Sequence, residues 1–359
     1  MTRSRTVEAR PGESRSCPEV VWQNGVMVDA PELAARYMRL VDGYLTTQLL
    51  YVAASLDVGG GLAGGPMSGP DLAASLGVDR AALTRVLRGL AAEGVLDEDE
   101  QGRFALTPLG GCLSSLRGAT IARGALYYDA AAGLLETVRD GGTSFAHVHG
   151  ASFFEHLQRH PDQYDVFQGS MAGRAEQEAR DVVAAYDFNG VRRLVDVGGG
   201  PAVTLAEILR AVPELAGVLI DRETVVPRAR QHLDRSGVGD RAECLPGDFF
   251  VTVPAGGDAY LLSRVLHDWD DRDAGRILAA CRSAMEPGVR LLVVEAILPE
   301  RASDAPAVIR MDLHMLILLG ARERTEAEFR NLLGAAGFTV QRVVRTGSSA
   351  GLGIIEAVA

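Results

Sequence analysis

The chain has 359 residues, of which 47% are hydrophobic and 23% charged, and this balance predicts a soluble globular protein of two domains. Its net charge of -11 disfavours non-specific binding to nucleic acid, which depends on a cationic surface. The sequence shows neither a membrane-spanning apolar run nor a secretory signal, so we expect no membrane partner. The cysteines are far apart and form no C-x-x-C pair, which favours reduced thiols in a cytoplasmic protein and no metal site.

Residues 1–25 are rich in Arg, Glu, Ser and Pro and lack hydrophobic periodicity, which is typical of a disordered tail. From Pro31 to about Ala54 apolar residues recur three and four positions apart, and this spacing predicts a helix. The glycine-rich stretch 59–66 follows no predicted strand, so we interpret it as a turn and not as a ligand-binding loop.

Residues 67–108 have the pattern of a winged helix-turn-helix. Gly77 closes a first helix, and Asp79 can cap a second one. Residues 94–97 and 103–106 follow as the two strands of a wing.

Two functions fit this winged pattern. The unit can serve as a dimerisation module, or it can bind DNA through arginines of its second helix, namely Arg80, Arg85 and Arg88. The five acidic residues between positions 93 and 100 would repel phosphates. We therefore favour dimerisation and expect no nucleic-acid partner.

The chain is predicted to be helical from Cys112 to about Asp187 and then to alternate strands with helices, which indicates a parallel sheet covered on both faces. The predicted strands are residues 192–198, 217–221, 241–246, 258–264, 290–296, 338–346 and 352–358. The last two are joined by a loop too short for a crossover helix, so one of them must run antiparallel. We expect an α/β fold in which a Rossmann-like sheet domain (186–359) follows a mainly helical winged-helix domain (26–185).

Ligands of such sheets bind beyond the carboxyl ends of the strands. The first strand ends in Gly198–Gly200, where glycine lets the backbone turn sharply and approach a ligand. Pro201 removes an N–H donor that a pyrophosphate would need, which argues against NAD. Asp221 ends the second strand and can accept ribose hydroxyls, while Asp248–Phe249 after the third suits an adenine ring. The predicted ligand is adenosine with a tail that lacks phosphate, and S-adenosylmethionine fits this description.

His267 follows the fourth strand, and Glu295 lies in the fifth. A phenol of pKa ~10 is a poor nucleophile at neutral pH, and an imidazole of pKa ~6.5 can take its proton. A carboxylate beside the imidazole would orient it and stabilise the imidazolium. His267 is therefore predicted as a general base, the alternative being a structural histidine at the start of a helix.

Four segments together resemble the small-molecule O-methyltransferases of plant natural-product and bacterial antibiotic pathways. They are DVGGG at 196–200, GDFF at 247–250, LHDWDD at 266–271 and ERT at 323–325. The similarity extends over nearly all of the chain from Pro31 onward. It implies a class I methyltransferase fold, S-adenosylmethionine as cofactor with S-adenosylhomocysteine as product, and homodimers formed through the N-terminal domain.

The resemblance also implies roles for individual residues. His267 becomes the general base, flanked by Glu295 and Glu323. The implied cofactor site comprises Gly198, Gly200, Asp221, Asp248, Phe249, Ser263 and Arg264. The implied acceptor pocket comprises Phe154, Met171, Asp268, Trp269, Met311 and Met315. Because this pocket is largely apolar and aromatic, we expect the acceptor to be a small aromatic compound methylated on a phenolic hydroxyl.

Two questions about neighbouring side chains stay open in the sequence. His314 either contacts the acceptor or is an ordinary residue of a helix face. Arg322 and Arg324 are candidates to pair with Glu323, and such a pair would weaken Glu323 as a partner of His267.

Two positions depart from the family pattern, which commonly has Gly at Ala202 and Lys at Ser263. Ala202 and Pro201 lie near the expected place of the methionine carboxylate. One alternative function is therefore an enzyme of the same fold that binds the donor without spending it, in a hydroxylation, decarboxylation or pericyclic reaction. Another is a winged-helix DNA-binding regulator. The joint presence of His267, Glu295 and Glu323 favours methyl transfer over the first of these alternatives.

Overall fold

The computed structural model describes residues 20–23, 26–348 and 350–359. The chain divides into two compact units, Met1–Ser114 and Ser115–Ala359. Among the described residues, no helix is both long enough and apolar enough to cross a membrane.

This division differs from the predicted boundary near residue 185. The helices of residues 115–185 belong to the second unit, because helix α12 (Pro161–Ala185) packs against α13 (Val203–Ala211). Val182 of α12 is buried in the core beside the large sheet. Helical periodicity does not reveal which domain a helix packs on, and for this reason the sequence placed the boundary too late.

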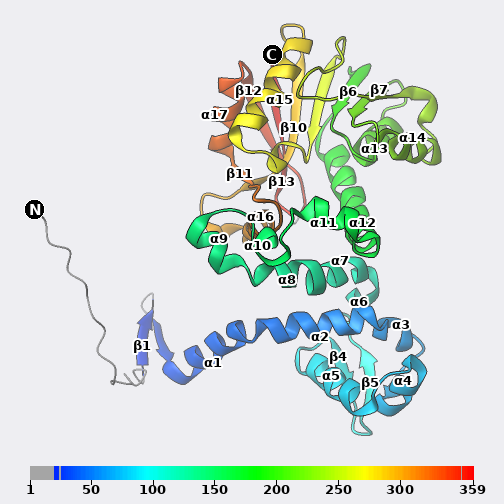
Figure 1. The fold of residues 1–359 in the computed structure, drawn as a ribbon, viewed down its shortest axis with the longest axis vertical. Helices are drawn as coiled ribbons and strands as arrows, with labels where there is room; N and C mark the ends of the chain where they lie inside the picture. The colour runs from blue at the N-terminus through cyan, green and yellow to red at the C-terminus, as the bar shows by residue number, and fades with distance from the viewer. Residues whose placement is uncertain (1–19, 24–25, 349) are drawn as a thin grey trace, which may run out of the picture. The chain divides into compact units, whose positions relative to one another are not determined.

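The first unit combines a hairpin, helices and a small three-stranded sheet (Figure 1). Its elements are β1 (Val20–Gln23), β2 (Val26–Asp29), α1 (Ala30–Val41), α2 (Gly43–Ser55), α3 (Val58–Gly61), β3 (Met67–Ser68), α4 (Gly69–Leu76), α5 (Arg80–Ala92), β4 (Leu96–Glu98) and β5 (Arg103–Leu106), followed by α6 (Cys112–Ser115), which ends one residue into the second unit.

Three expectations for this unit need correction. The tail predicted for residues 1–25 contains strand β1, which pairs antiparallel with β2; residues 1–19, 24 and 25 lie outside the described residues. The single helix predicted from residue 31 to 54 is broken at Asp42 into α1 and α2. The turn predicted at 59–66 begins inside α3, because the Asp57 side chain caps that helix by accepting a hydrogen bond from Gly60 N–H.

The winged-helix prediction agrees with the structure in its details. The Asp79 carboxylate accepts a hydrogen bond from Ala82 N–H at 2.7 Å and caps α5, and Gly77 ends α4 in the left-handed conformation. The wing strands β4 and β5 pair antiparallel, and the short strand β3 joins them as a third. Arg88, one of the arginines considered for DNA binding, forms an ion pair with Glu98 of the wing, with 3.5 Å between Arg88 Nε and Glu98 Oε2.

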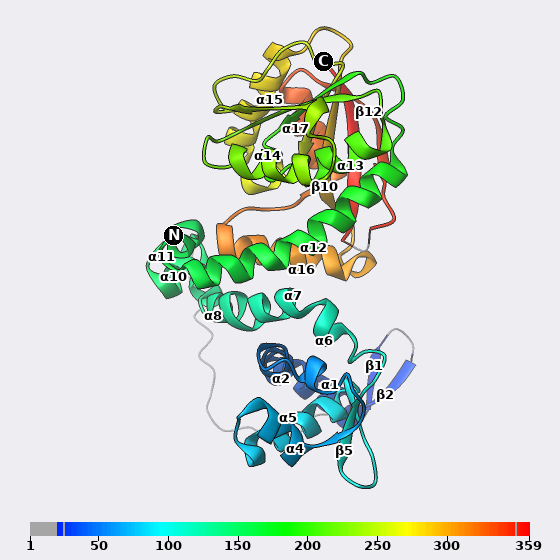
Figure 2. The same ribbon diagram turned by 90° about the vertical axis from the view of Figure 1, so that its right-hand side faces the viewer.

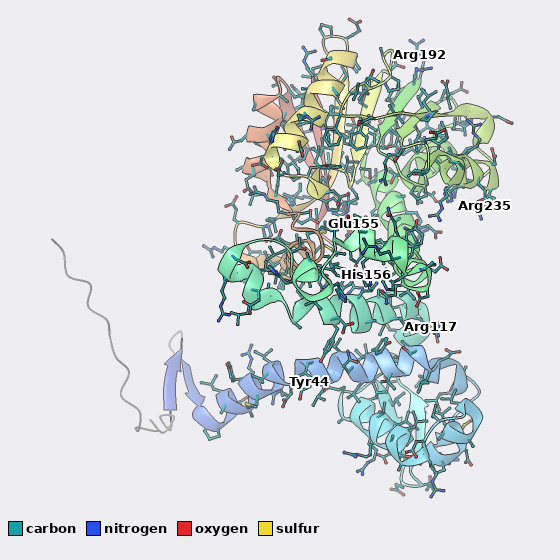
Figure 3. The ribbon with its side chains drawn as sticks, in the orientation of Figure 1. Tyr44, Arg117, Glu155, His156, Arg192 and Arg235 are labelled. Atoms are coloured by element: carbon teal, nitrogen blue, oxygen red, sulfur yellow. The ribbon has the colours of Figure 1, made fainter. Side chains whose placement is uncertain are left out.

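Helices α1 and α2 present large apolar side chains to solvent within the part of the chain that is described (Figure 3 labels Tyr44). Leu40 is 75% exposed. The exposed residues, which we call the α1–α2 face, are Tyr37, Met38, Leu40, Val41, Tyr44 and Leu45. An apolar surface of this kind marks a site of protein–protein contact.

The second unit begins with short helices and continues into the large sheet. Its helices are α7 (Arg117–Ala122), the π-helical turn η1 (Arg123–Tyr127), α8 (Tyr128–Ala131), α9 (Leu134–Asp140), α10 (Ser144–His149), α11 (Phe153–Arg159), α12, α13, α14 (Val226–Arg235), α15 (Asp271–Ala284), α16 (Pro306–Leu319) and α17 (Glu326–Ala335), with 3₁₀ turns η2 (Gly239–Arg241), η3 (Leu266–Asp268) and η4 (Ala302–Asp304). Its strands are β6 (Arg193–Val197), β7 (Ala216–Asp221), β8 (Ala242–Pro246), β9 (Ala259–Ser263), β10 (Arg290–Leu298), β11 (Arg324–Thr325), β12 (Thr339–Arg345) and β13 (Leu352–Val358).

The large sheet has the predicted architecture. Its strand order is β12-β13-β10-β9-β6-β7-β8, and only β13 runs antiparallel to its neighbours along this path. The chain leaves β6 toward β7 on one side and later returns to β9 on the other. Such a reversal opens a crevice at the carboxyl ends of the strands, where ligands bind. Strand β11, which pairs with β10, was not predicted because two residues show no periodicity.

Helices cover both faces of the sheet (Figures 1 and 2). Helices α13 and α14, with the end of α12, form one hydrophobic core against the sheet, and α15 and α17 form another on the opposite face. The central strands are buried on both sides, which explains why they read as continuous apolar runs.

Candidate functional site

The glycine loop after β6 is tied to the end of β7. Gly198 and Gly200 both take left-handed backbone angles, with φ of +72° and +56°. Gly200 N–H donates a hydrogen bond of 2.9 Å to Asp221 Oδ2, so the structure brings together these three residues predicted for the cofactor. Ala202, at φ +63° and fully buried, takes an angle that favours glycine. This conformation explains why glycine is usual at this position.

Asp196 lies beneath the loop and was given no role from the sequence. It is fully buried, and neither carboxylate oxygen has a hydrogen-bond partner among the described residues. Its burial, and secondarily the charge of Asp221, raise the pKa of Asp196 to about 7. A single carboxylate inside an apolar strand, just before three glycines, was the signal that could have assigned it to the site.

The predicted adenine residues lie at the next strand end. Asp248 is exposed and its Oδ1 accepts a hydrogen bond from Phe250 N–H at 2.9 Å. Phe249 is half-buried beside Gly198, where a Cβ would come within 3.2 Å of its ring. Trp269, predicted for the acceptor pocket, packs its ring 4.7 Å from that of Phe250 and therefore belongs to this aromatic group.

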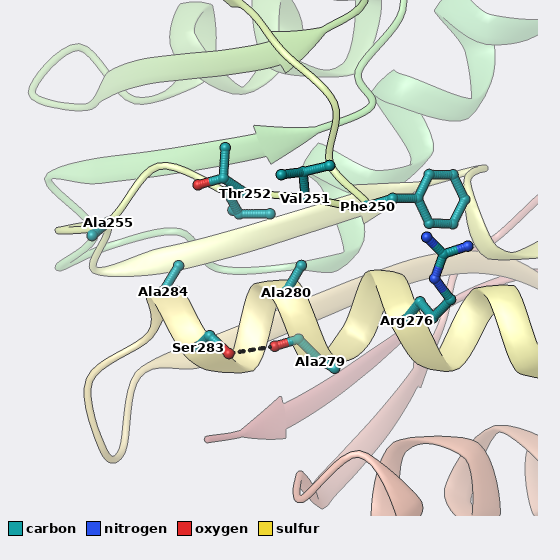
Figure 4. A pocket seen from close by; sticks show the side chains of 10 residues that line it. Phe250, Val251, Thr252, Ala255, Arg276, Ala279, Ala280, Ser283 and Ala284 are labelled. Atoms are coloured by element: carbon teal, nitrogen blue, oxygen red, sulfur yellow. Dashed lines mark hydrogen bonds between the residues drawn. The ribbon is translucent and has the colours of Figure 1, made fainter.

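A separate cavity of about 480 Å³ lies behind Phe250, between the segment before β9 and helix α15 (Figure 4). At the edge of this cavity, the Arg276 guanidinium lies 4.8 Å from the centre of the Phe250 ring. The cavity is lined by Phe250, Val251, Thr252, Val253, Ala255, Arg276, Ala279, Ala280, Ser283 and Ala284. None of the predicted site residues lines it, so it is distinct from the candidate site.

His267 is buried in turn η3, which follows β9, and the carboxylates of Glu295 and Glu323 lie on the Nδ1 side of its ring. Its Nδ1 lies 3.2 Å from Glu323 Oε1 and 4.0 Å from Glu295 Oε2. A carboxylate only accepts hydrogen bonds, so in the neutral imidazole Nδ1 carries the hydrogen and Nε2 keeps its lone pair. Asp268 Oδ1 lies 3.4 Å from that Nε2.

Glu295 acts mainly on the backbone of this turn. Its Oε1 accepts hydrogen bonds from the N–H groups of Val265, Leu266 and His267, at 3.0, 2.8 and 3.3 Å. Glu295 and Glu323 thus have different functions: the first holds the turn, and the second holds the imidazole.

Arg264, predicted for the cofactor, turns inward to the carboxylates. Its backbone takes a left-handed φ of +58°. Its Nη1 lies 3.3 Å from Glu323 Oε1 and 3.8 Å from Glu295 Oε2, and its Nε lies 3.7 Å from Glu178 Oε2. Ser263, the other residue of that prediction, faces Thr204 at 3.4 Å between their hydroxyl oxygens.

The partner of Glu323 is therefore Arg264 and neither arginine proposed from the sequence. Arg322 pairs with Glu328 at 2.6 Å. Arg324 is fully buried and binds Asp271 together with backbone carbonyls. These pairings join segments far apart in the chain, which local patterns do not reveal.

The charges of this cluster favour a protonated imidazole. Burial, and next Arg264, act to lower the pKa of His267, but Glu295, Glu323 and Asp268 outweigh them and raise it above its ordinary value. Burial would raise the pKa of Glu323, but its bond to His267 and the charge of Arg264 hold it below its usual range. Donor atoms of His267, Glu295 and Glu323 all lie within 4.8 Å of one another, a spacing that a metal ion could use. The Arg264 guanidinium already supplies positive charge there.

The residues predicted for the acceptor lie on helices α11, α12 and α16 and at the end of turn η3. Met171 on α12 and Met311 on α16 are half-buried, and Met315 is buried. Phe154 on α11 is 51% exposed and packs on Phe153.

Comparison with known proteins decides the family. Residues 131–339 match the model of the O-methyltransferase domain, and residues 38–115 match the O-methyltransferase dimerisation domain. The chain belongs to the O-methyltransferase family. A phenazine O-methyltransferase of Lysobacter antibioticus is 43% identical over 91% of this O-methyltransferase and 97% of its own length.

Solved structures agree with this assignment. The mitomycin 7-O-methyltransferase MmcR has a TM-score of 0.83 and 36% identity, covering 92% of this chain and 99% of its own. Another solved structure is an O-methyltransferase from neocarzinostatin biosynthesis with S-adenosylmethionine and 2-hydroxy-5-methyl naphthoic acid. It has a TM-score of 0.74 and 32% identity, and the match covers 88% of this chain and 96% of its own. As a member of this family, the chain is an S-adenosylmethionine-dependent methyltransferase.

The residues at the strand ends fit this cofactor. Asp196 offers a buried carboxylate without a hydrogen-bond donor, next to a loop whose backbone permits close approach, and the methionine ammonium is such a donor. Asp221 ends β7, and Phe249 lies beside Gly198 at the same edge of the sheet.

Proposed function

We propose that this O-methyltransferase transfers the methyl group of S-adenosylmethionine to a phenolic hydroxyl of a small aromatic compound, with His267 as the general base. The observation that carries the proposal is the buried imidazole, whose Nδ1–H is held by Glu323 at 3.2 Å. This bond leaves the lone pair of Nε2 on the side of the ring away from Glu295 and Glu323, where Asp268 Oδ1 lies 3.4 Å from it.

The steps follow from these groups. The acceptor hydroxyl gives its proton to His267 Nε2, and the charge of Glu323 stabilises the imidazolium that forms. The phenolate oxygen forms a bond to the methyl carbon while the carbon–sulfur bond breaks, which leaves S-adenosylhomocysteine and a proton for solvent. The donor supplies an activated sulfonium methyl, so alignment of the two substrates contributes much of the acceleration.

The test is to incubate the enzyme with S-adenosylmethionine and hydroxyarenes and to quantify both products by mass spectrometry. We expect S-adenosylhomocysteine and an aryl methyl ether in equal amounts. A converted acceptor without S-adenosylhomocysteine would instead support a reaction in which the donor is bound but not consumed.

We also propose that the homodimer forms through the α1–α2 face, on the strength of its exposed apolar side chains. Replacement of Leu40 by Asp is expected to shift the protein from dimer to monomer at micromolar concentration, as measured by light scattering after size exclusion. Val251→Asp is the matched control, since Val251 is 77% exposed but lies elsewhere. A Leu40→Asp protein that stays dimeric would place the interface on another surface.

A further inference from the structure

Arg174, one turn after Met171 on α12, carries a buried nitrogen without a partner. Its Nε donates to Glu178 Oε1 at 2.7 Å, and its Nη1 donates to Met311 Sδ at 3.3 Å. Its Nη2 is buried and has no hydrogen-bond partner within the described residues. A thioether is a weak acceptor, so much of the donor capacity of this guanidinium is unused.

The charge of Arg174 is also only partly neutralised. Glu178, its ion-pair partner, is shared with Arg264, whose Nε lies 3.7 Å from Glu178 Oε2. Arg264 has Glu323 and Glu295 as further partners, whereas Glu178 is the ion-pair partner of Arg174 among the described residues.

Side chains near Arg174 add positive charge and flat surfaces. Tyr127 and His314 stack edge to face with ring centres 5.0 Å apart, and the Arg123 guanidinium lies 5.7 Å from the centre of the Tyr127 ring. Burial, with the charges of Arg123, Arg174 and Arg310, lowers the pKa of His314 to about 4, so this histidine is neutral. Its Nδ1 is buried and without a partner among the described residues, like Arg174 Nη2.

Building on the proposed function, we propose that Arg174 binds a carboxylate carried by the aromatic acceptor and so selects anionic hydroxyarenes. Guanidinium is the side chain best suited to a carboxylate, because its N–H groups match the two oxygens. Arg174 is connected to the base through Glu178, Arg264 and Glu323, so an acceptor held at its carboxylate lies beside the catalytic cluster. This contact would hold the acceptor in one orientation and so position its hydroxyl toward His267.

The experiment measures binding directly, with the enzyme saturated with S-adenosylhomocysteine. The probes are 1-hydroxy-2-naphthoate and its methyl ester, titrated by calorimetry. We expect the wild-type enzyme to bind the acid at least tenfold more tightly than the ester. Arg174→Gln should lose at least tenfold in affinity for the acid and little for the ester. Arg174→Lys should recover part of the loss, because it keeps the charge.

Arg180→Gln is the control, since Arg180 is an exposed residue of the same helix that donates to Gln177. Equal affinity for acid and ester in the wild type, or equal losses for both probes in Arg174→Gln, would overturn the inference. If Arg174→Gln weakened the binding of S-adenosylhomocysteine and not that of the acid, Arg174 would be assigned to the donor's carboxylate, and this result would also overturn the inference. Because the readout is binding, a selective loss supports the inference even if methyl transfer to a hydroxyl is not found.

Discussion

His267→Ala is expected to lower kcat/KM for a phenolic acceptor by about 10²–10⁴-fold at pH 7, the usual contribution of a general base. The loss should shrink as the pH approaches ~10, because the phenol then ionises without help. The measurement is the initial rate of S-adenosylhomocysteine formation between pH 6 and 10. A loss of the same size at every pH would show that His267 has a structural function only.

The charges around His267 set the sign of the pH dependence. Its pKa is raised, so the neutral base is lost already as the pH falls through a value above that of a free imidazole. Glu323→Gln removes a charge that raises this pKa, so the acidic limb of the kcat/KM profile should move to lower pH. Glu326→Gln is the control, because Glu326 pairs with Arg330 on the exposed part of α17. An unmoved limb in Glu323→Gln would contradict the assignment.

Arg324→Met is expected to lower the free energy of unfolding by about 2–5 kcal/mol, because it removes hydrogen bonds of a fully buried charged group, each contributing ~1.5–3 kcal/mol. The fully buried guanidinium donates to the carbonyls of Leu266 and Trp269 and to Asp271 Oδ1, each at 2.8–2.9 Å. Methionine fills a similar volume but leaves the Trp269 carbonyl without this donor and the Leu266 carbonyl with the longer bond from Trp269 N–H, at 3.3 Å. Because they lie on either side of His267, activity should fall with stability.

The measurement is urea denaturation followed by circular dichroism, with Arg322→Met as the matched control. Arg322 is an exposed neighbour paired with Glu328, and such surface pairs contribute about 0–1 kcal/mol. If both variants lose the same small amount, Arg324 does not hold the turn that carries His267.

Local patterns in the sequence predicted much of this molecule correctly. The strands of the large sheet and its antiparallel last strand followed from apolar runs and loop lengths, because a parallel connection needs a crossover. Asp79 was recognised as a helix cap because a cap depends only on residues a few positions apart. Gly198, Gly200 and Asp221 were found together because carboxyl ends of neighbouring parallel strands share one edge of the sheet.

The directions and partners of charged side chains were decided only by the tertiary structure. Arg264 turns toward Glu178 and Glu323, which are far from it in sequence, so no local spacing announces the pairing. Arg174 was overlooked because a hydrogen-bonding atom without a partner becomes visible only when burial excludes water from it. The sequence by itself determined the fold and the family, and it predicted His267 after β9 as the base. The folded chain determined which charges surround that base, because ion pairs depend on distances between elements that fold together from remote segments.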